Sequence, residues 1–430
     1  MTPPTRIEIS KLCNPHNKGS KFTINAIVHI SCILLLTKQH TCSIMCMGDL
    51  MEPITRLQKL SALMGLEPAE EIGCPNIAPL QTEDIYITNA ATPNGKHISL
   101  LKTLLTSACE SNCNYCPFRA GRDYHRTRLI PEEMAKVFIS LHRAGIVEGI
   151  FLSSGLAGGS IKTQDNLIDT IELLRNKHNY TGYVHLKIMP GAERSQVERI
   201  MQIADRVSVN LEAPNTKRLE HLAPRKEFIN DLIKPIRWIE EIRKSMPPYL
   251  GWNGRWPSIT TQFVVGPAGE SDYELLMTTA HLHKKYSLSR AYFRAFTPIP
   301  GTPFENKTAT LPIRELRLYQ ASFLLRDYKF QLEDLPFETT GSLPLESDPK
   351  TMWASLHLSE RPVELNIAAK KELLRIPGIG PKGAKAILLT RKHEKLKNIS
   401  DLRKIGINPK RAIPFILLNG KRPEYQLSFI

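Results

Sequence analysis

The chain has 430 residues, of which 42% are apolar and 23% are charged, and its formal net charge at pH 7 is +15. This composition is globular, with room for about two to three domains, and it excludes a collagen-like, low-complexity or disordered protein. The longest apolar run near the start, residues 24–36, contains Asn, His and Ser and is shorter than the roughly 20 residues that cross a bilayer. We therefore expect a soluble, cytoplasmic protein without a signal peptide.

The positive charge is concentrated near the C-terminus. Residues 361–430 carry 16 Lys and Arg against 5 Asp and Glu, which is a net charge of +11, whereas the rest of the chain carries only +4. A basic segment attached to a nearly neutral one indicates a polyanionic partner, most simply nucleic acid. Solubility is the alternative explanation for such a charge.

The N-terminal region differs from the rest of the chain. Residues 1–50 show no clear helix or strand period, and we expect them to be a dispensable extension. Residues 51–96 are predicted as a helical or irregular lead-in, because apolar residues from Ile54 to Met64 recur at helical spacing. No role is assigned to the scattered cysteines of these two segments, which are Cys13, Cys32, Cys42, Cys46 and Cys74.

Short apolar runs alternate with helical patterns over residues 97–310. This alternation predicts parallel βα units and an α/β fold. About six units fit a partial or complete (β/α) barrel, whose chemistry lies on the loops after the strands. Strands are predicted at His97–Leu105, Gly149–Ser153, Tyr183–Ile188, Arg206–Leu211, Ser258–Val265 and Arg290–Phe296, and helices at Pro131–Ala144, Asp165–His178, Ser195–Ala204, Glu227–Ser245 and Ser271–Tyr286.

Two further segments follow the predicted barrel. Residues 311–360 are predicted as one helix, over 312–330, and a linker, because residues 334–363 contain several Pro, Ser and Gly. Residues 361–430 form the basic module, which we expect to be a small all-α domain.

Three cysteines form a tight group directly after the first predicted barrel strand. Cys109, Cys113 and Cys116 have the spacing C-x3-C-x2-C. Three thiolates on one loop can hold three irons of a [4Fe–4S] cluster and leave the fourth iron open. The alternative is a zinc site with Cys74 or His125 as fourth ligand, but structural zinc usually takes pairs of ligands from two places.

This spacing, with Tyr115 in the aromatic place, resembles the motif of the radical SAM superfamily, and the resemblance covers about residues 97–305. It implies a cluster that binds S-adenosylmethionine and cleaves it reductively to methionine and a 5′-deoxyadenosyl radical. It further implies that the strand ends bind this cofactor, through Tyr115, Ser153, Ser154, Gly155, Lys187, Asn210, Glu212, Gln262 and Gly266. A salt bridge within the protein is the alternative role for Lys187 and Glu212, and the Ser-Ser-Gly turn departs from the common Gly-Gly-Glu form.

A basic stretch follows the cysteines. It contains Arg119, Arg122, Tyr124, His125, Arg126 and Arg128. Such a loop could hold a phosphate-bearing substrate. The alternative is a solvated basic loop.

Two predicted helices in the basic module, at residues 364–375 and 381–391, are separated by Ile376-Pro-Gly-Ile-Gly380. The pattern resembles a helix–hairpin–helix motif, which grips the DNA backbone without reading bases. It implies DNA contacts from Gly378, Ile379, Gly380, Lys382 and Lys385. A looser second copy is predicted, with its hairpin at 402–407 and its second helix at 410–418. A protein-interaction module is the alternative.

The combination of the two motifs resembles a radical SAM branch assigned to DNA modification and repair, whose genes neighbour one for a uracil-DNA-glycosylase-like protein. The resemblance implies a radical SAM enzyme acting on DNA, with such a protein as a partner and flavodoxin or ferredoxin as electron donor. One alternative is a radical SAM enzyme that modifies RNA or tRNA. The other is a non-catalytic, zinc-containing DNA-binding protein.

Overall fold

The computed structural model describes residues 45–66, 85–91 and 97–424. Most of the predicted N-terminal extension, together with Cys13, Cys32, Cys42 and Cys74, lies outside these ranges, and the side chain of Cys46 is not described either. Across the described ranges, no helix is long and apolar enough to cross a membrane.

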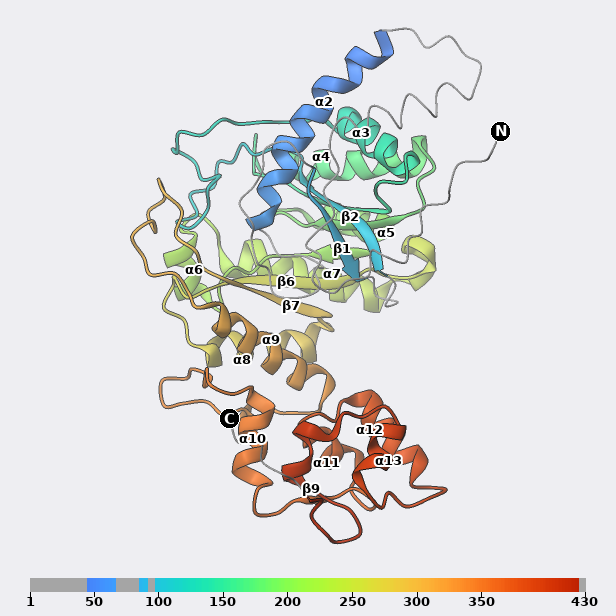
Figure 1. The fold of residues 1–430 in the computed structure, drawn as a ribbon. Helices are drawn as coiled ribbons and strands as arrows, with labels where there is room; N and C mark the ends of the chain where they lie inside the picture. Colours follow the sequence, from blue (N-terminus) through green and yellow to red (C-terminus); the bar gives the residue numbers. More distant parts are fainter. Residues whose placement is uncertain (1–44, 67–84, 92–96, 425–430) are drawn as a thin grey trace, which may run out of the picture. The chain divides into compact units, whose positions relative to one another are not determined.

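A seven-stranded sheet, with its strands in the order β1 to β7, forms a half-barrel (Figure 1). The first pair, β1 and β2, is antiparallel, and the pairs from β2 to β6 are parallel. The partial form of the predicted barrel is therefore confirmed, and the antiparallel β1 was not predicted. The strands are β1 (Ile87–Ala91), β2 (His97–Leu104), β3 (Gly149–Ser153), β4 (Tyr183–Lys187), β5 (Arg206–Ser208), β6 (Ser258–Val265) and β7 (Arg290–Ala295).

Helices follow the strands as predicted, and each of the strands β2 to β7 is followed along the chain by at least one helix. The helix α4 begins five residues earlier than predicted, because it starts directly after Gly158 and Gly159 at positive φ and has no side-chain cap to mark it. The helices are α2 (Met45–Ala62), α3 (Pro131–Arg143), α4 (Ser160–Glu172), α5 (Arg194–Ile203), α6 (Thr216–Leu222), α7 (Lys234–Ser245), α8 (Asp272–Tyr286) and α9 (Pro312–Asp327).

The two faces of the parallel strands have different chemistry. Leu152, Leu186 and Val207 lie side by side in register, are fully buried and share one aliphatic face. Residues on the other face include Lys102, His185 and Arg206, which are also buried. Phe151 lies in register between Lys102 and His185, so this second face mixes polar and aromatic side chains. The strands end at one edge of the sheet, where the loops with the predicted site residues begin.

The chain divides into two compact units. One comprises Met1–Asn210 and Ala223–Thr261, and the other comprises Leu211–Leu222 and Gln262–Ile430. The strand β6 runs from the first unit into the second. The first unit holds the cysteine loop and the ends of β2 to β5, and the second holds the end of β6 and the whole basic module.

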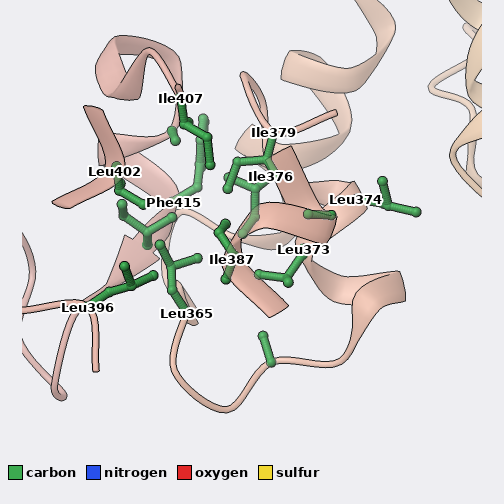
Figure 2. Close-up of a cluster of buried hydrophobic side chains, with 14 of the residues drawn as sticks. Leu365, Leu373, Leu374, Ile376, Ile379, Ile387, Leu396, Leu402, Ile407 and Phe415 are labelled. Carbon is green, nitrogen blue, oxygen red and sulfur yellow. The ribbon is translucent and has the colours of Figure 1, made fainter. Parts of the chain in front are cut away.

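The basic module has a continuous apolar core that begins before residue 361 (Figure 2). Ala354 and Leu358 in α10 belong to the same core as Leu373, Ile379 and Ile387. The predicted linker therefore contains a helix that is part of the basic module's core. The elements are α10 (Pro349–His357), α11 (Lys370–Arg375), α12 (Pro381–Thr390), α13 (Ile399–Lys404) and the paired strands β8 (Val363–Glu364) and β9 (Ile416–Leu417).

The second copy of the helix–hairpin–helix is incomplete. The predicted turn at Gly406 forms, but residues 402–404 of the predicted hairpin belong to the helix α13 instead. The predicted second helix is wrong, because residues 409–411 and 413–415 form two 3-10 turns before β9. Pro409 and Pro414 lack the N–H that a continuous helix would need.

Candidate active site and nucleic-acid interface

The cysteine triplet lies on the long loop between β2 and α3. None of the three cysteines forms a disulfide bond with another described residue. Cys113 is buried, with 5% of its surface exposed, and Cys109 and Cys116 are half-buried. The amide of Cys116 donates to the carbonyl of Cys113 over 3.3 Å, so the last two cysteines share one tight turn.

The chemistry of this donor set fits an iron–sulfur cluster. Burial raises the pKa of the Cys116 thiol well above its usual range, and the neighbouring Cys113 and Cys109 raise it further, although Lys226 opposes them. The three sulfurs therefore interact in one buried space, where a bound cationic centre would stabilise their thiolate forms. No group of three Cys, His, Asp or Glu within the described ranges converges closely enough for a single metal ion. Three thiols on one short loop are the donor set of a cluster that has three of its irons bound by the protein.

The side chain of Arg126 holds the cysteine loop from within. Its Nη1 donates to the carbonyls of Ser107 and Phe118 over 2.9 and 2.7 Å. Its Nη2 donates to the carbonyls of Arg119 and Arg122 over 2.9 and 3.3 Å. One guanidinium thus binds four carbonyl oxygens, from residues before and after the cysteine triplet. Arg126 therefore acts neither as a phosphate ligand nor as a solvated charge.

Two other arginines of this stretch also bind the loop backbone. Arg122 donates to the carbonyl of Pro117 over 3.0 Å, and Arg119 donates to that of Asn112 over 3.4 Å. His125 and Arg128 are exposed, as expected for a solvated loop. The sequence does not distinguish the arginines that bind the loop backbone from the residues that face solvent, because both kinds occur in the same run of basic residues.

We expect Arg126→Met to weaken cluster retention. Hydrogen bonds from a charged donor contribute about 1.5–3 kcal/mol each, so the loop should open more often and lose iron to a chelator at least about tenfold faster. Iron release is followed by absorbance after anaerobic addition of the chelator. The matched control is Arg128→Met, since Arg128 is an exposed arginine on the same loop. Equal release rates in the two variants would contradict the bracing role.

A second set of contacts fixes the other side of the cysteine loop. The amide of Glu110 donates to the carbonyl of Leu156 over 2.7 Å, and its carboxylate accepts from the amide of Gly158 over 2.6 Å. Arg225, which follows α6, donates to the carbonyl of Glu110 over 2.7 Å and, through its amide, to Asn112 Oδ1 over 3.2 Å. Glu110 and Arg225 were missed by the sequence analysis, because neither belongs to a motif.

The turn after β3 touches the cysteine loop directly. The amide of Gly155 donates to the carbonyl of Thr106 over 2.8 Å. A Cβ at Gly155 would overlap the carbonyl oxygen of Ala108 and would lie 3.2 Å from Cβ of Cys109. Gly155 is therefore needed for close approach of the two backbones, which is a structural role beside the predicted cofactor contact.

The other predicted residues of the first unit lie at strand ends. Ser153 and Ser154 are buried, and the Ser154 hydroxyl donates to the carbonyl of Gly155 over 2.8 Å. Among the described residues, the buried hydroxyl of Ser153 has no hydrogen-bond partner. Asn210, after β5, is buried, while Lys187, which ends β4, is half-buried, as is Tyr115 on the cysteine loop.

The second unit contains Glu212, Gln262 and Gly266. Glu212 is buried at a φ of 64°, a conformation that non-glycine residues seldom adopt, and its amide donates to the carbonyl of Gln262 over 2.9 Å. Gly266 has a φ of 110°, and its amide donates to the carboxylate of Glu270. Burial raises the pKa of Glu270, whereas the Gly266 amide and Arg314 lower it. The hydrogen bond between Glu270 and the turn after β6 was not predicted.

The hairpin of the basic module has the geometry expected of the motif. Gly378 has a φ of 81°, and Gly380 is the N-cap of α12. Lys382 and Lys385 are exposed on the first turns of α12. Ile379 is fully buried, so its side chain belongs to the core, and its amide donates to the carbonyl of Ile376 over 3.1 Å. Free amides at a helix start and nearby lysines form an arrangement that attracts phosphate.

A half-barrel with a cysteine triplet on the loop after its first parallel strand is the fold of an iron–sulfur enzyme, and a helical module follows it in the chain. Residues 103–278 match the model of the radical SAM superfamily, and residues 359–412 match that of the helix–hairpin–helix motif. The chain therefore contains a radical SAM domain, over residues 103–278, and a C-terminal helix–hairpin–helix motif. The family's cofactors are a [4Fe–4S] cluster and S-adenosylmethionine. The alternative of a non-catalytic zinc protein is therefore wrong.

Several solved structures resemble the chain at low sequence identity. They include the hydrogenase maturase HydG from Carboxydothermus hydrogenoformans, at 16% identity and a TM-score of 0.41, with 53% of this chain and 51% of that one covered. Methylornithine synthase (PylB) has 12% identity and a TM-score of 0.42, over 64% and 68% of the two chains. A radical SAM methyltransferase from Sphaerobacter thermophilus has 17% identity and a TM-score of 0.40, over 56% and 70%.

The chain spans about half the length of the HydG structures that it matches. No curated protein matches the chain.

Proposed function

We propose that this protein is a radical SAM enzyme that acts on DNA, in repair or base modification. The observation that carries the proposal is the presence, in one chain, of the radical SAM match over residues 103–278 and the helix–hairpin–helix match over residues 359–412. The net charge of +11 in residues 361–430 supports a polyanionic substrate. The resemblance to the branch assigned to DNA modification and repair supports the same substrate class.

The first unit would hold the cluster. Cys109, Cys113 and Cys116 are the proposed ligands, and Arg126 and Glu110 keep the loop that carries them closed. When bound, the cluster and S-adenosylmethionine supply the reductive chemistry of the family. The residues proposed to contact S-adenosylmethionine remain Tyr115 on the cysteine loop and those at or near the strand ends, namely Ser153, Ser154, Gly155, Lys187, Asn210, Glu212, Gln262 and Gly266.

The basic module would hold the DNA. The hairpin of Gly378, Ile379 and Gly380 presents the amides at the start of α12 to a backbone phosphate, and Lys382 and Lys385 add positive charge beside it. Contacts of this kind carry no base specificity. The half-barrel, and not the basic module, would therefore select the nucleotide that reacts. A target base would have to leave the stack to reach the strand ends.

Other partners follow from the same proposal. An electron donor such as flavodoxin or ferredoxin is required for reductive cleavage, and a uracil-DNA-glycosylase-like protein is the proposed partner in repair. We place the enzyme in the cytoplasm, where reducing conditions keep cysteines available as ligands.

RNA is the second candidate substrate. The segment from Arg294 to Pro303, after β7, is similar to that of tRNA-modifying relatives, which keeps RNA or tRNA as an alternative.

The substrate is tested with anaerobically reconstituted protein. S-adenosylmethionine cleavage is measured as 5′-deoxyadenosine formed with duplex DNA, single-stranded DNA, tRNA or no nucleic acid. We expect duplex DNA to stimulate cleavage most, because the module grips duplex backbone, and tRNA to compete poorly for binding. Stimulation by tRNA but not by DNA would support the alternative. Failure of every nucleic acid to bind or stimulate would contradict both.

A further inference from the structure

A buried lysine from outside the helix–hairpin–helix motif supports the hairpin. Lys350 lies in the first turn of α10, before the matched residues 359–412, and only 8% of its surface is exposed. Its Nζ donates to the carbonyl of Ile379 over 2.7 Å and lies 4.5 Å from the centre of the Tyr328 ring. The ammonium group thus holds the hairpin residue between Gly378 and Gly380, whose neighbouring amides would receive a phosphate.

Two residues near Lys350 also lie close to the two glycines of the hairpin. The Tyr328 hydroxyl lies 3.2 Å from the position that a Cβ on Gly380 would take, and Arg411 Cβ lies 3.3 Å from that of Gly378. Arg411 is itself paired with Asp348, the N-cap residue of α10. The titratable and charged groups facing Lys350 are therefore Asp348 beside α10, Arg411 from residues 409–411 and Tyr328 at the end of α9.

We propose that Lys350 is a positioning residue of the phosphate site, and that its ammonium form holds the Ile376–Gly380 hairpin in the conformation that binds DNA. The proposal rests on the proposed function, since it assumes that the hairpin binds duplex backbone. A motif search does not find this residue, because it lies on α10 and reaches the hairpin only in the folded module.

The charge state of Lys350 is sensitive to pH near neutrality. Burial lowers the pKa of Lys350 to about 7, Arg411 lowers it further, and Asp348 opposes them. A phosphate at the hairpin favours the ammonium form of Lys350. When Lys350 is neutral in the free protein, DNA binding is therefore accompanied by the uptake of a proton at this residue. Affinity for DNA is therefore fully present below about pH 7 and falls as the pH rises above it.

The experiment compares full-length Lys350→Met, Lys350→Arg and wild type by fluorescence anisotropy with a labelled duplex, between about pH 6 and 8.5. The matched control is Lys395→Met, which removes one exposed charge from the same module. At pH 6 we expect Lys350→Met to bind about tenfold more weakly than this control, because a charge-assisted hydrogen bond is lost. Lys350→Arg should bind at pH 8.5 as tightly as at pH 6, since arginine keeps its proton.

Thermal unfolding of each variant separates a loss of fold from a loss of positioning. If Lys350→Met unfolds the module, the comparison of wild type with Lys350→Arg across the pH range still decides the proposal. Identical pH profiles for these two proteins, or equal affinities for Lys350→Met and Lys395→Met, would overturn the role of Lys350 while leaving DNA binding intact. Absence of duplex binding by the wild type at every pH would overturn the proposed substrate as well.

Discussion

Replacing Cys113 by alanine is expected to abolish S-adenosylmethionine cleavage while leaving duplex affinity within about twofold of wild type, since Cys113 is not part of the apolar core of the basic module. Cys113 is the most buried of the triplet and the middle of its three thiols. Its removal leaves two ligands, which are too few to hold a cubane cluster with one open iron. The helix–hairpin–helix has its own core, which this change does not touch.

Iron and sulfide counts on anaerobically purified protein accompany the cleavage assay. We expect about four of each per wild-type chain and a large loss in Cys113→Ala. The matched control is Cys74→Ala, which should retain a full cluster and full cleavage if the triplet alone binds iron. Retained cleavage in Cys113→Ala would contradict the ligand assignment. Counts near eight in the wild type would indicate a second cluster held by upstream cysteines.

The double substitution Lys382→Ala and Lys385→Ala is expected to weaken duplex binding and to flatten its salt dependence. Each phosphate contact that is lost removes about 0.9 from the slope of log affinity against log salt concentration. A decrease of about 1.8 in that slope is therefore expected if both exposed lysines contact phosphates. The measurement is a titration of labelled duplex at several salt concentrations. The loss should be similar for different DNA sequences, because the backbone carries no base information.

The control for this experiment removes the same charge from elsewhere. Lys136 on α3 and Lys284 on α8 are exposed and lie outside the basic module. An equal change of slope in Lys136→Ala with Lys284→Ala would show that only the overall charge matters. Deleting residues 361–430 is a poorer test, because Ala354 and Leu358 would lose the core they pack against.

The sequence was most informative where local chemistry and local structure coincide. The strands β3, β4 and β6 were predicted because each is a short aliphatic run between turn residues, and α12 because Pro381 follows a glycine-rich break. The cysteine spacing identified the cofactor class for the same reason, since three ligands on one short loop need no knowledge of the rest of the fold.

The sequence was least informative where a residue acts on a distant part of the chain. The basic stretch around Arg126 was expected to face a substrate or solvent, but folding turns the side chain onto carbonyls of its own loop. The helix α10 was read as linker because Pro, Ser and Gly surround it, and its place in the core of the basic module depends on long-range packing. Pro409 and Pro414 in the sequence already argue against a second continuous helix, and therefore against a second complete hairpin motif.

The close contact at Gly155 limits how this protein can vary in evolution. The backbone of the turn after β3 and the backbone before Cys109 approach so closely that even a methyl group would displace one of them. By contrast, Gly159 has open space where a Cβ would be and is constrained only by its positive φ. Homologues that share the cysteine loop should therefore keep glycine at 155 because of the close contact, and at 159 because a φ of 88° with a ψ of 165° is essentially restricted to glycine.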